Sequence, residues 1–215
     1  MSAFLDWIIT HPELLWRTTW EHVVMSAASL VVAAAIALPL GIWLAAGRRA
    51  STAVLGAVNA LRTIPSLALL VVMLPVLGTG MLPSVVALVL YGLPAILLNT
   101  VAGLQGVDRD VVDAARGQGL SRMEVLRQVE LPLASPVILA GIRNAAVQIV
   151  AAATLAVFIG GGGYGELISA GMGLFEFPQL VAGTLLVAAL AGAAELGFGA
   201  AGRRLSRRLG VEAAA

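Results

Sequence analysis

The sequence predicts an all-α integral membrane protein, and three observations lead to that fold class. First, 60% of the residues are hydrophobic and 12% are charged, whereas soluble domains are closer to half apolar and a quarter charged. Second, the mean hydropathy is +0.97. Third, the apolar residues form long continuous segments, whereas strands of a membrane β-barrel alternate apolar and polar residues. The length of 215 residues indicates one domain.

Five segments are expected to cross the membrane. The first carries no charge, and a helix of that length extends roughly 37 Å, which crosses a ~30 Å hydrocarbon core with some tilt. The expected spans are residues 23–47, 51–77, 83–104, 136–159 and 177–202. Together they form a membrane domain over residues 23–202, preceded by an N-terminal segment, residues 1–22, and followed by a charged tail, residues 203–215. Trp7, Trp16 and Trp20 suit a membrane-interface belt or, equally, the packing of an amphipathic helix against the bundle.

A polar stretch at residues 107–132 interrupts the apolar pattern and is expected to begin with a short helix. Asp108 can cap its N-terminus. Gly117 and Gly119 can end it, because glycine adopts the left-handed conformation that a helix C-terminus often requires.

A second short helix is expected to follow directly. Ser121 and Glu124 have the spacing of a capping box, in which each residue satisfies the other's backbone N–H. Pro132 is expected to end this helix, because proline disfavours helical geometry at the preceding residue, Leu131. The stretch therefore predicts a helix–turn–helix on one face of the membrane.

This stretch resembles the coupling loop of ABC-importer permeases. That pattern is Glu-Ala-Ala, three residues, Gly, nine residues, a β-branched aliphatic residue, one residue, and Leu-Pro. Asp replaces the usual Glu and Val the usual Ile, and both keep charge or shape. The resemblance implies a type I ABC importer permease fold of five transmembrane helices with cytoplasmic coupling helices. The plain alternative is a solvated hairpin. The matching positions are Asp113, Ala114, Ala115, Gly119, Val129, Leu131 and Pro132.

A second resemblance concerns the substrate. The run from Arg62 to Leu70, Arg-Thr-Ile-Pro-Ser-Leu-Ala-Leu-Leu, is similar to the second-span signature of the quaternary-amine branch of these permeases. This resemblance implies import of glycine betaine, choline or carnitine. The methionine branch carries a related signature and remains an alternative, as do importers of other small solutes.

Polar, charged and glycine residues in or beside the spans are candidates for the translocation pathway or its gate. Pro65 removes a helix hydrogen bond, which lipid tolerates only against protein or a water-filled cavity. A charge such as that of Arg62 is costly in the bilayer unless it is paired or snorkels to the interface. The candidates are Arg62, Thr63, Pro65, Ser66, Asn99, Arg143, Asn144, Gly162, Gly163, Tyr164 and Glu195.

More specific expectations apply to the Arg143 and Glu195 pair and to the glycine-rich run. Arg143 and Glu195 lie at comparable depth, roughly 12 Å from the same face, so they are expected either to pair across the fourth and fifth spans or to snorkel separately. The glycine-rich run 160–165 is expected to be a flexible gate, a binding-protein contact or a plain loop. Similar permeases carry leucine where this chain has Tyr164.

Orientation follows from the distribution of arginine. With five spans, ten of the thirteen basic residues fall on the side that holds the 107–132 stretch and the C-terminus. The positive-inside rule makes that side cytoplasmic and places the N-terminus outside. The expected location is a bacterial cytoplasmic (inner) membrane.

No catalytic, cofactor or metal site is expected on this chain, because there is no phosphate-binding Gly-x-x-x-x-Gly-Lys-Ser/Thr loop, no cysteine and only two histidines. The resemblance implies a separate ABC ATPase subunit that holds ATP and Mg²⁺ and receives the hairpin by a helix-in-groove contact. It also implies an extracytoplasmic substrate-binding protein and a second permease chain, identical or paralogous. The lipid bilayer is a partner, and nucleic acid is not.

Two readings from other classes remain. A non-transporting membrane scaffold would use polar residues only to join helices. A channel or ion-coupled carrier would need acidic groups facing a cavity and an internal repeat, and the sequence offers only Glu195 and no convincing repeat.

Overall fold

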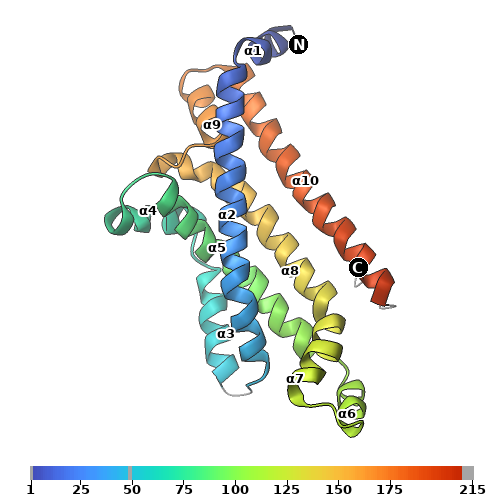
Figure 1. Cartoon of the computed structure of the whole chain (residues 1–215). Helices are drawn as coiled ribbons and strands as arrows, with labels where there is room; N and C mark the ends of the chain where they lie inside the picture. Colours follow the sequence, from blue (N-terminus) through green and yellow to red (C-terminus); the bar gives the residue numbers. More distant parts are fainter. Residues whose placement is uncertain (1, 48–49, 210–215) are drawn as a thin grey trace.

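The computed structural model describes residues 2–47 and 50–209, and every regular element within these ranges is a helix. Figure 1 shows a bundle in which α1 and α9 lie at one end and α6 and α7 at the other. The elements are α1 (Ser2–Thr10), α2 (Pro12–Ala45), α3 (Ala50–Leu61), α4 (Ser66–Leu77), α5 (Met81–Gln105), α6 (Arg109–Gly117), α7 (Arg122–Val125), the π-helical η1 (Leu126–Glu130), α8 (Leu131–Ala152), the 3₁₀-helical η2 (Ala153–Ile159), α9 (Tyr164–Gly173) and α10 (Phe177–Leu209).

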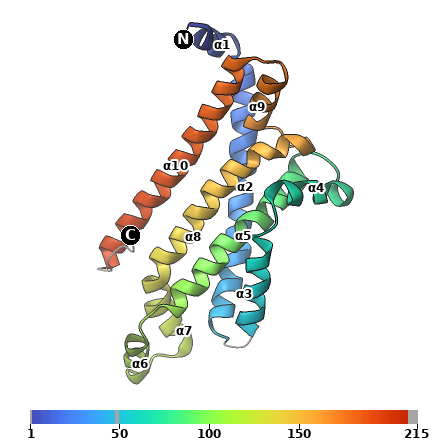
Figure 2. The ribbon, with the colours of Figure 1, turned by 180° about the vertical axis from the view of Figure 1, so that it is seen from behind.

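The helix α5 is the centre of the bundle. It packs against α2 on one side and α8 on the other, and α10 packs against α8 and α9, as the two opposite views show (Figures 1 and 2). Close contact between α5 and α8 depends on small residues. A side-chain carbon added at Gly141 would lie 2.5 Å from the Cβ of Asn99 and 2.9 Å from the carbonyl oxygen of Ala95. The two buried apolar clusters of the bundle both include residues of α2, α5 and α8.

Four helices of the described ranges are long and apolar enough to cross a membrane. They are α2, α5, the continuous helix from Arg122 to Ile159, and α10. The helix α2 begins at Pro12, so residues 12–22 of the expected N-terminal segment continue into the first span. Arg48 and Arg49, expected to end that span, lie outside the described residues. The helix α10 runs beyond the expected end of the fifth span, through Arg203 and Arg204 to Leu209.

The expected span over residues 51–77 consists of two helices, α3 and α4, with Pro65 in the break between them. The axes of α3 and α4 differ by 94° across the break between Leu61 and Ser66. Pro65 has ψ 137°, an extended conformation that turns the chain out of α3, and proline also disfavours a helical residue before it. Each half rises only about 18 Å. The pair is therefore a fifth span only if both halves together cross the membrane.

The expectation that Pro132 ends the second short helix is wrong. The chain is helical from Arg122 to Ile159, so the fourth span begins before Pro136. The π-helical turn explains this continuity. The N–H of Leu131 donates to the carbonyl of Leu126, five residues back, and this wider turn accommodates a proline ring and its missing N–H.

Candidate functional site

The predicted hairpin forms at the end of the molecule opposite the N-terminus, and its caps are those expected from the sequence. The Oδ1 of Asp108 accepts the N–H of Asp110 at 2.9 Å, which caps α6. The Oε2 of Glu124 accepts the N–H of Ser121 at 2.8 Å, and the Oγ of Ser121 accepts the N–H of Glu124 at 3.4 Å, which completes the capping box of α7. Gly119 connects the two helices with φ +89°.

A small apolar core holds the two helices of the hairpin together. Val112 and Ala115 of α6 are buried against Val125 of α7, whose side chain is 1% exposed. Val129 and Leu120 pack against this cluster. The hairpin thus has a small apolar core of its own.

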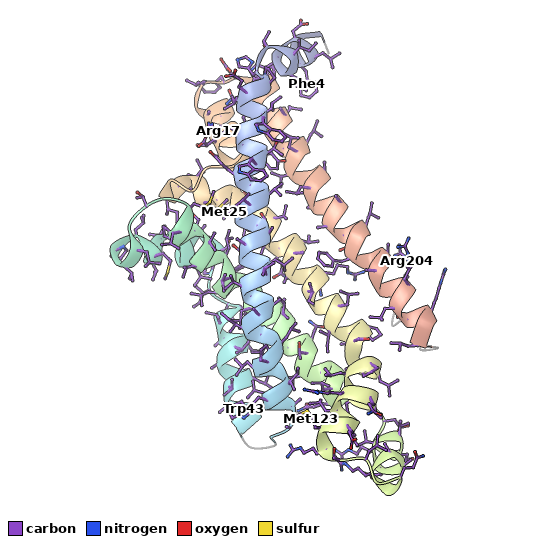
Figure 3. All side chains as sticks on the ribbon, in the orientation of Figure 1. Phe4, Arg17, Met25, Trp43, Met123 and Arg204 are labelled. Carbon is purple, nitrogen blue, oxygen red and sulfur yellow. The ribbon has the colours of Figure 1, made fainter. Side chains whose placement is uncertain are left out.

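The residues of the coupling pattern divide into two groups. Ala115, Gly119 and Val129 hold the hairpin together, as described above. Asp113 and Ala114 are exposed on α6, and the Asp113 carboxylate lies 3.6 Å from the guanidinium of Arg116. Leu131 and Pro132 are half-buried on the continuous helix that leads into α8. Figure 3 shows a further exposed side chain of the hairpin, Met123.

The predicted pathway residues do not converge on one site. A first group lies at the sharp break between α3 and α4, where Arg62, Thr63 and Pro65 are exposed and Ser66 is half-buried. The N–H groups of Arg62 and Thr63 close the end of α3 with short-range bonds to Asn59 and Ala60. This break is a polar, exposed interruption between two apolar helices, so lipid is an unsuitable neighbour for it.

A second group lines a groove of about 900 Å³ between α8, α10, the end of α5 and the start of α6. Arg143 lines this groove and pairs with Glu195 of α10, with the Nη1 and Oε1 atoms 3.5 Å apart. Asn99 also lines the groove, but its amide donates to the carbonyl of Ala95 in its own helix at 2.8 Å. Asn144, the next residue along α8, is exposed.

The glycine run forms a third group, at the opposite end of the molecule, and it is packed. Gly161 to Gly165 are buried, and Gly163 has φ +80°. The N–H of Gly163 donates to the Oε2 of Glu21 at 2.9 Å, and a side chain at Gly162 would collide with the same carboxylate. The glycine run is therefore a packed turn that is tied to α2.

His22, next along α2, completes this contact. Its ring is fully buried and stacks on Tyr164 with centroids 4.4 Å apart. Its Nδ1 accepts the N–H of Tyr164 at 3.3 Å, which leaves Nε2 to donate to the carbonyl of Val150 at 3.0 Å. The network thus joins α2 to both α8 and α9.

Arg17 links the same region by charge. Its guanidinium lies 3.0 Å from Glu21 and 2.6 Å from Glu166 of α9, and Figure 3 shows it near the N-terminal end of α2. This network was not predicted from the sequence. The only local signal is the four-residue spacing of Arg17 and Glu21, which is common on helix surfaces.

The family model for the inner membrane component of binding-protein-dependent transport systems matches residues 37–211. The chain belongs to this family.

Relatives support the same assignment along nearly the whole chain. The choline transport permease OpuBB of Bacillus subtilis is 40% identical and covers 83% of this chain and 82% of its own length. The glycine betaine/carnitine/choline permease OpuCB of B. subtilis is 41% identical, with 89% and 88% covered. The carnitine permease OpuCB of Listeria monocytogenes is 38% identical, with 96% and 94% covered.

Solved permease structures share the fold. An inward-facing structure of the MetNI methionine ABC transporter matches with a TM-score of 0.80 and 24% identity, over 91% of this chain and 98% of that chain. An amino acid ABC transporter matches with a TM-score of 0.72 and 18% identity. The roles of the individual hairpin and pathway residues stay predictions.

Proposed function

We propose that this chain is the permease subunit of an ATP-driven importer of quaternary-amine osmoprotectants: choline, glycine betaine and carnitine. The substrate class comes from the relatives, whose names include these solutes and whose sequences match over most of both lengths. The likeness to a methionine transporter at 24% identity supports the fold alone. The single structural observation that favours coupling to a partner is the hairpin, which has its own core and presents Asp113 and Ala114 to a neighbour.

In this proposal the hairpin faces the cytosol and contacts a separate ATPase subunit, which holds ATP and Mg²⁺. Arginines support the orientation. Arg17 lies at the α1 end, whereas the hairpin and the end of α10 carry Arg109, Arg116, Arg122, Arg127, Arg203, Arg204 and Arg207. By the positive-inside rule the N-terminus is then outside, where a substrate-binding protein delivers the solute, in a bacterial inner membrane.

The continuous helix from Arg122 to Ile159 could transmit the force that the ATPase subunit exerts on the hairpin when it closes. It extends roughly 57 Å at 1.5 Å per residue, from the hairpin to the turn tied by Glu21. Movement of the hairpin, driven by closure of the ATPase, would therefore tilt one rigid element that crosses the bundle. Nucleotide would bias the balance between inward-open and outward-open states in this way.

The pathway itself is proposed to lie between two permease chains, identical or paralogous. Asn144 supports this arrangement, because an exposed polar side chain in the membrane-crossing part of α8 is better placed against protein or water than against lipid. The exposed break at Arg62–Ser66 supports it for the same reason.

Uptake by the complete importer tests the proposal. The chain is reconstituted with its ATPase and binding protein, and ATP-driven uptake of labelled choline, glycine betaine, carnitine and methionine is compared. We expect uptake of the quaternary amines and none of methionine. Uptake of methionine alone would favour the methionine-type importer, and no ATP-driven uptake of any solute would favour a scaffold.

A variant of the hairpin tests the coupling role. Ala114→Trp adds a bulky side chain at an exposed position, so we expect unchanged folding and a fall in ATP-driven uptake of about tenfold or more. Val181→Trp, at an exposed position of α10, is the matched control and is expected to retain uptake. Full uptake by Ala114→Trp would contradict the coupling role of this surface.

A further inference from the structure

The groove between α8 and α10 contains two converging cations. Arg143 of α8 and Arg203 of α10 both line it. A side-chain carbon placed on Gly199 would lie 3.4 Å from the Nη1 of Arg203 and 3.7 Å from the Nη1 of Arg143. Two guanidinium charges this close, at most about 7 Å apart, repel each other unless an anion lies nearby.

The acidic groups around the groove do not balance these charges. Within the described ranges, Glu195 forms one ion pair, with Arg143 at 3.5 Å. Among the side chains that the structure describes, no carboxylate lies within 4.0 Å of the Arg203 guanidinium. The carboxylate of Asp108, on the groove wall, is engaged as the cap of α6 and forms no ion pair with either arginine in the described part of the chain.

One donor in the groove also lacks an acceptor. The Nε of Arg143 is buried and has no hydrogen-bond partner among the described atoms. A buried N–H without a partner costs free energy, and more so on a charged group. Two arginines therefore line the same groove, one without a carboxylate partner among the described residues and one with an unsatisfied buried donor, and an oxyanion between them would supply the missing negative charge.

The walls of the groove suit a lipid. Val137, Leu139 and Phe198 give it an apolar lining, and the nearly buried Ser206 contributes a hydroxyl group beside Arg203 in the last turns of α10. A phosphate with an attached acyl chain matches a cationic, partly apolar groove better than a fully hydrated anion does.

We propose that Arg143 and Arg203 form an anion site in this groove that binds the phosphate of an anionic phospholipid, with the acyl chain against α8 and α10. The assignment to the inner leaflet, where basic grooves meet anionic headgroups, rests on the orientation proposed above. The presence of an anion site in the groove does not depend on that orientation. A soluble carboxylate, such as that of glycine betaine or carnitine, has related chemistry and is the competing source.

Native mass spectrometry of the delipidated permease complex tests the site, with phosphatidylglycerol and phosphatidylcholine added separately. We expect preferential retention of phosphatidylglycerol, and a loss of affinity of about tenfold in Arg203→Gln. Arg204→Gln, which removes the same charge from the neighbouring residue outside the groove, is the matched control and is expected to change affinity little. Arg203 is exposed, so its variant is expected to fold, and thermal unfolding in detergent checks this.

Each of the following outcomes would contradict phospholipid binding in this groove. Equal losses in Arg203→Gln and Arg204→Gln would show attraction to general surface charge. Arg203-dependent binding of glycine betaine but not of choline, without retention of phosphatidylglycerol, would assign the site to a soluble carboxylate. A disulfide between the two permease chains through Gly199→Cys would place a partner chain in the groove. Because the readout is binding, these results are independent of whether the complex imports osmoprotectants.

Discussion

Truncation of Glu21 is expected to release the buried glycine turn from α2. In Glu21→Ala the N–H of Gly163 loses its only side-chain acceptor, the Oε2 at 2.9 Å. A hydrogen bond to a charged group contributes about 1.5–3 kcal/mol. Arg17 adds little to this loss, because half of its side chain is exposed and it keeps Glu166 at 2.6 Å. The expected cost is about 2 kcal/mol, which makes local opening roughly 30-fold more frequent.

Hydrogen exchange of the Gly163 amide measures this effect directly. We expect Glu21→Ala to exchange roughly 30-fold faster than the unmodified chain, and Glu21→Gln, which keeps an acceptor oxygen, to exchange at an intermediate rate. Glu13→Ala is the matched control, because Glu13 is an exposed acid in the first turn of the same helix. If Gly163 exchanges equally fast in Glu21→Ala and Glu13→Ala, the turn is held by something other than this carboxylate.

Three further substitutions probe other contacts. Val125→Ala is expected to destabilise the hairpin by about 1–2 kcal/mol, because Val125 is the most buried side chain of its small core, and limited proteolysis at the hairpin measures this. Gly141→Val is expected to cost about 2 kcal/mol or more through collision with Asn99; Gly192→Val, which meets open space, is the control in thermal unfolding, and equal melting temperatures would refute the collision. Glu195→Gln is expected to cost less than about 1 kcal/mol, because both partners of the ion pair are partly exposed; a larger, salt-independent loss would contradict this.

The parts that could be predicted from the sequence depend on short-range interactions. The caps at Asp108 and Ser121 and the turn at Gly119 involve residues two or three positions apart, so their geometry follows from local rules. The similar depth of Arg143 and Glu195 in the membrane, measured from the same face, was predictable because the rise per residue of a helix is constant. Whether they face each other depends on how α8 and α10 are rotated about their axes, which only packing determines.

The parts that could not be predicted depend on distant contacts or on unusual backbone geometry. The contact between Glu21 and Gly163 joins residues 142 positions apart, and no local pattern marks it. The 94° break after Leu61 and the continuity through Pro132 both concern proline. Proline can bend, break or be absorbed by a helix, and the outcome depends on whether neighbouring turns relax, as η1 does before Pro132.

The π-helical turn η1 sets the angular phase between the hairpin and the remainder of α8. Such a turn contains one residue more than an ordinary helical turn, and each residue of an α-helix advances the side-chain direction by about 100°. Deletion of one residue within Leu126–Glu130 would therefore yield an ordinary α-helical turn and leave Arg143 and Asn144 close to their present direction, whereas deletion of one residue from the α-helical part of α8 before Arg143 would turn them by about 100°. This five-residue segment is consequently the part of the helix that absorbs the loss of one residue with the least change in the direction of the side chains beyond it.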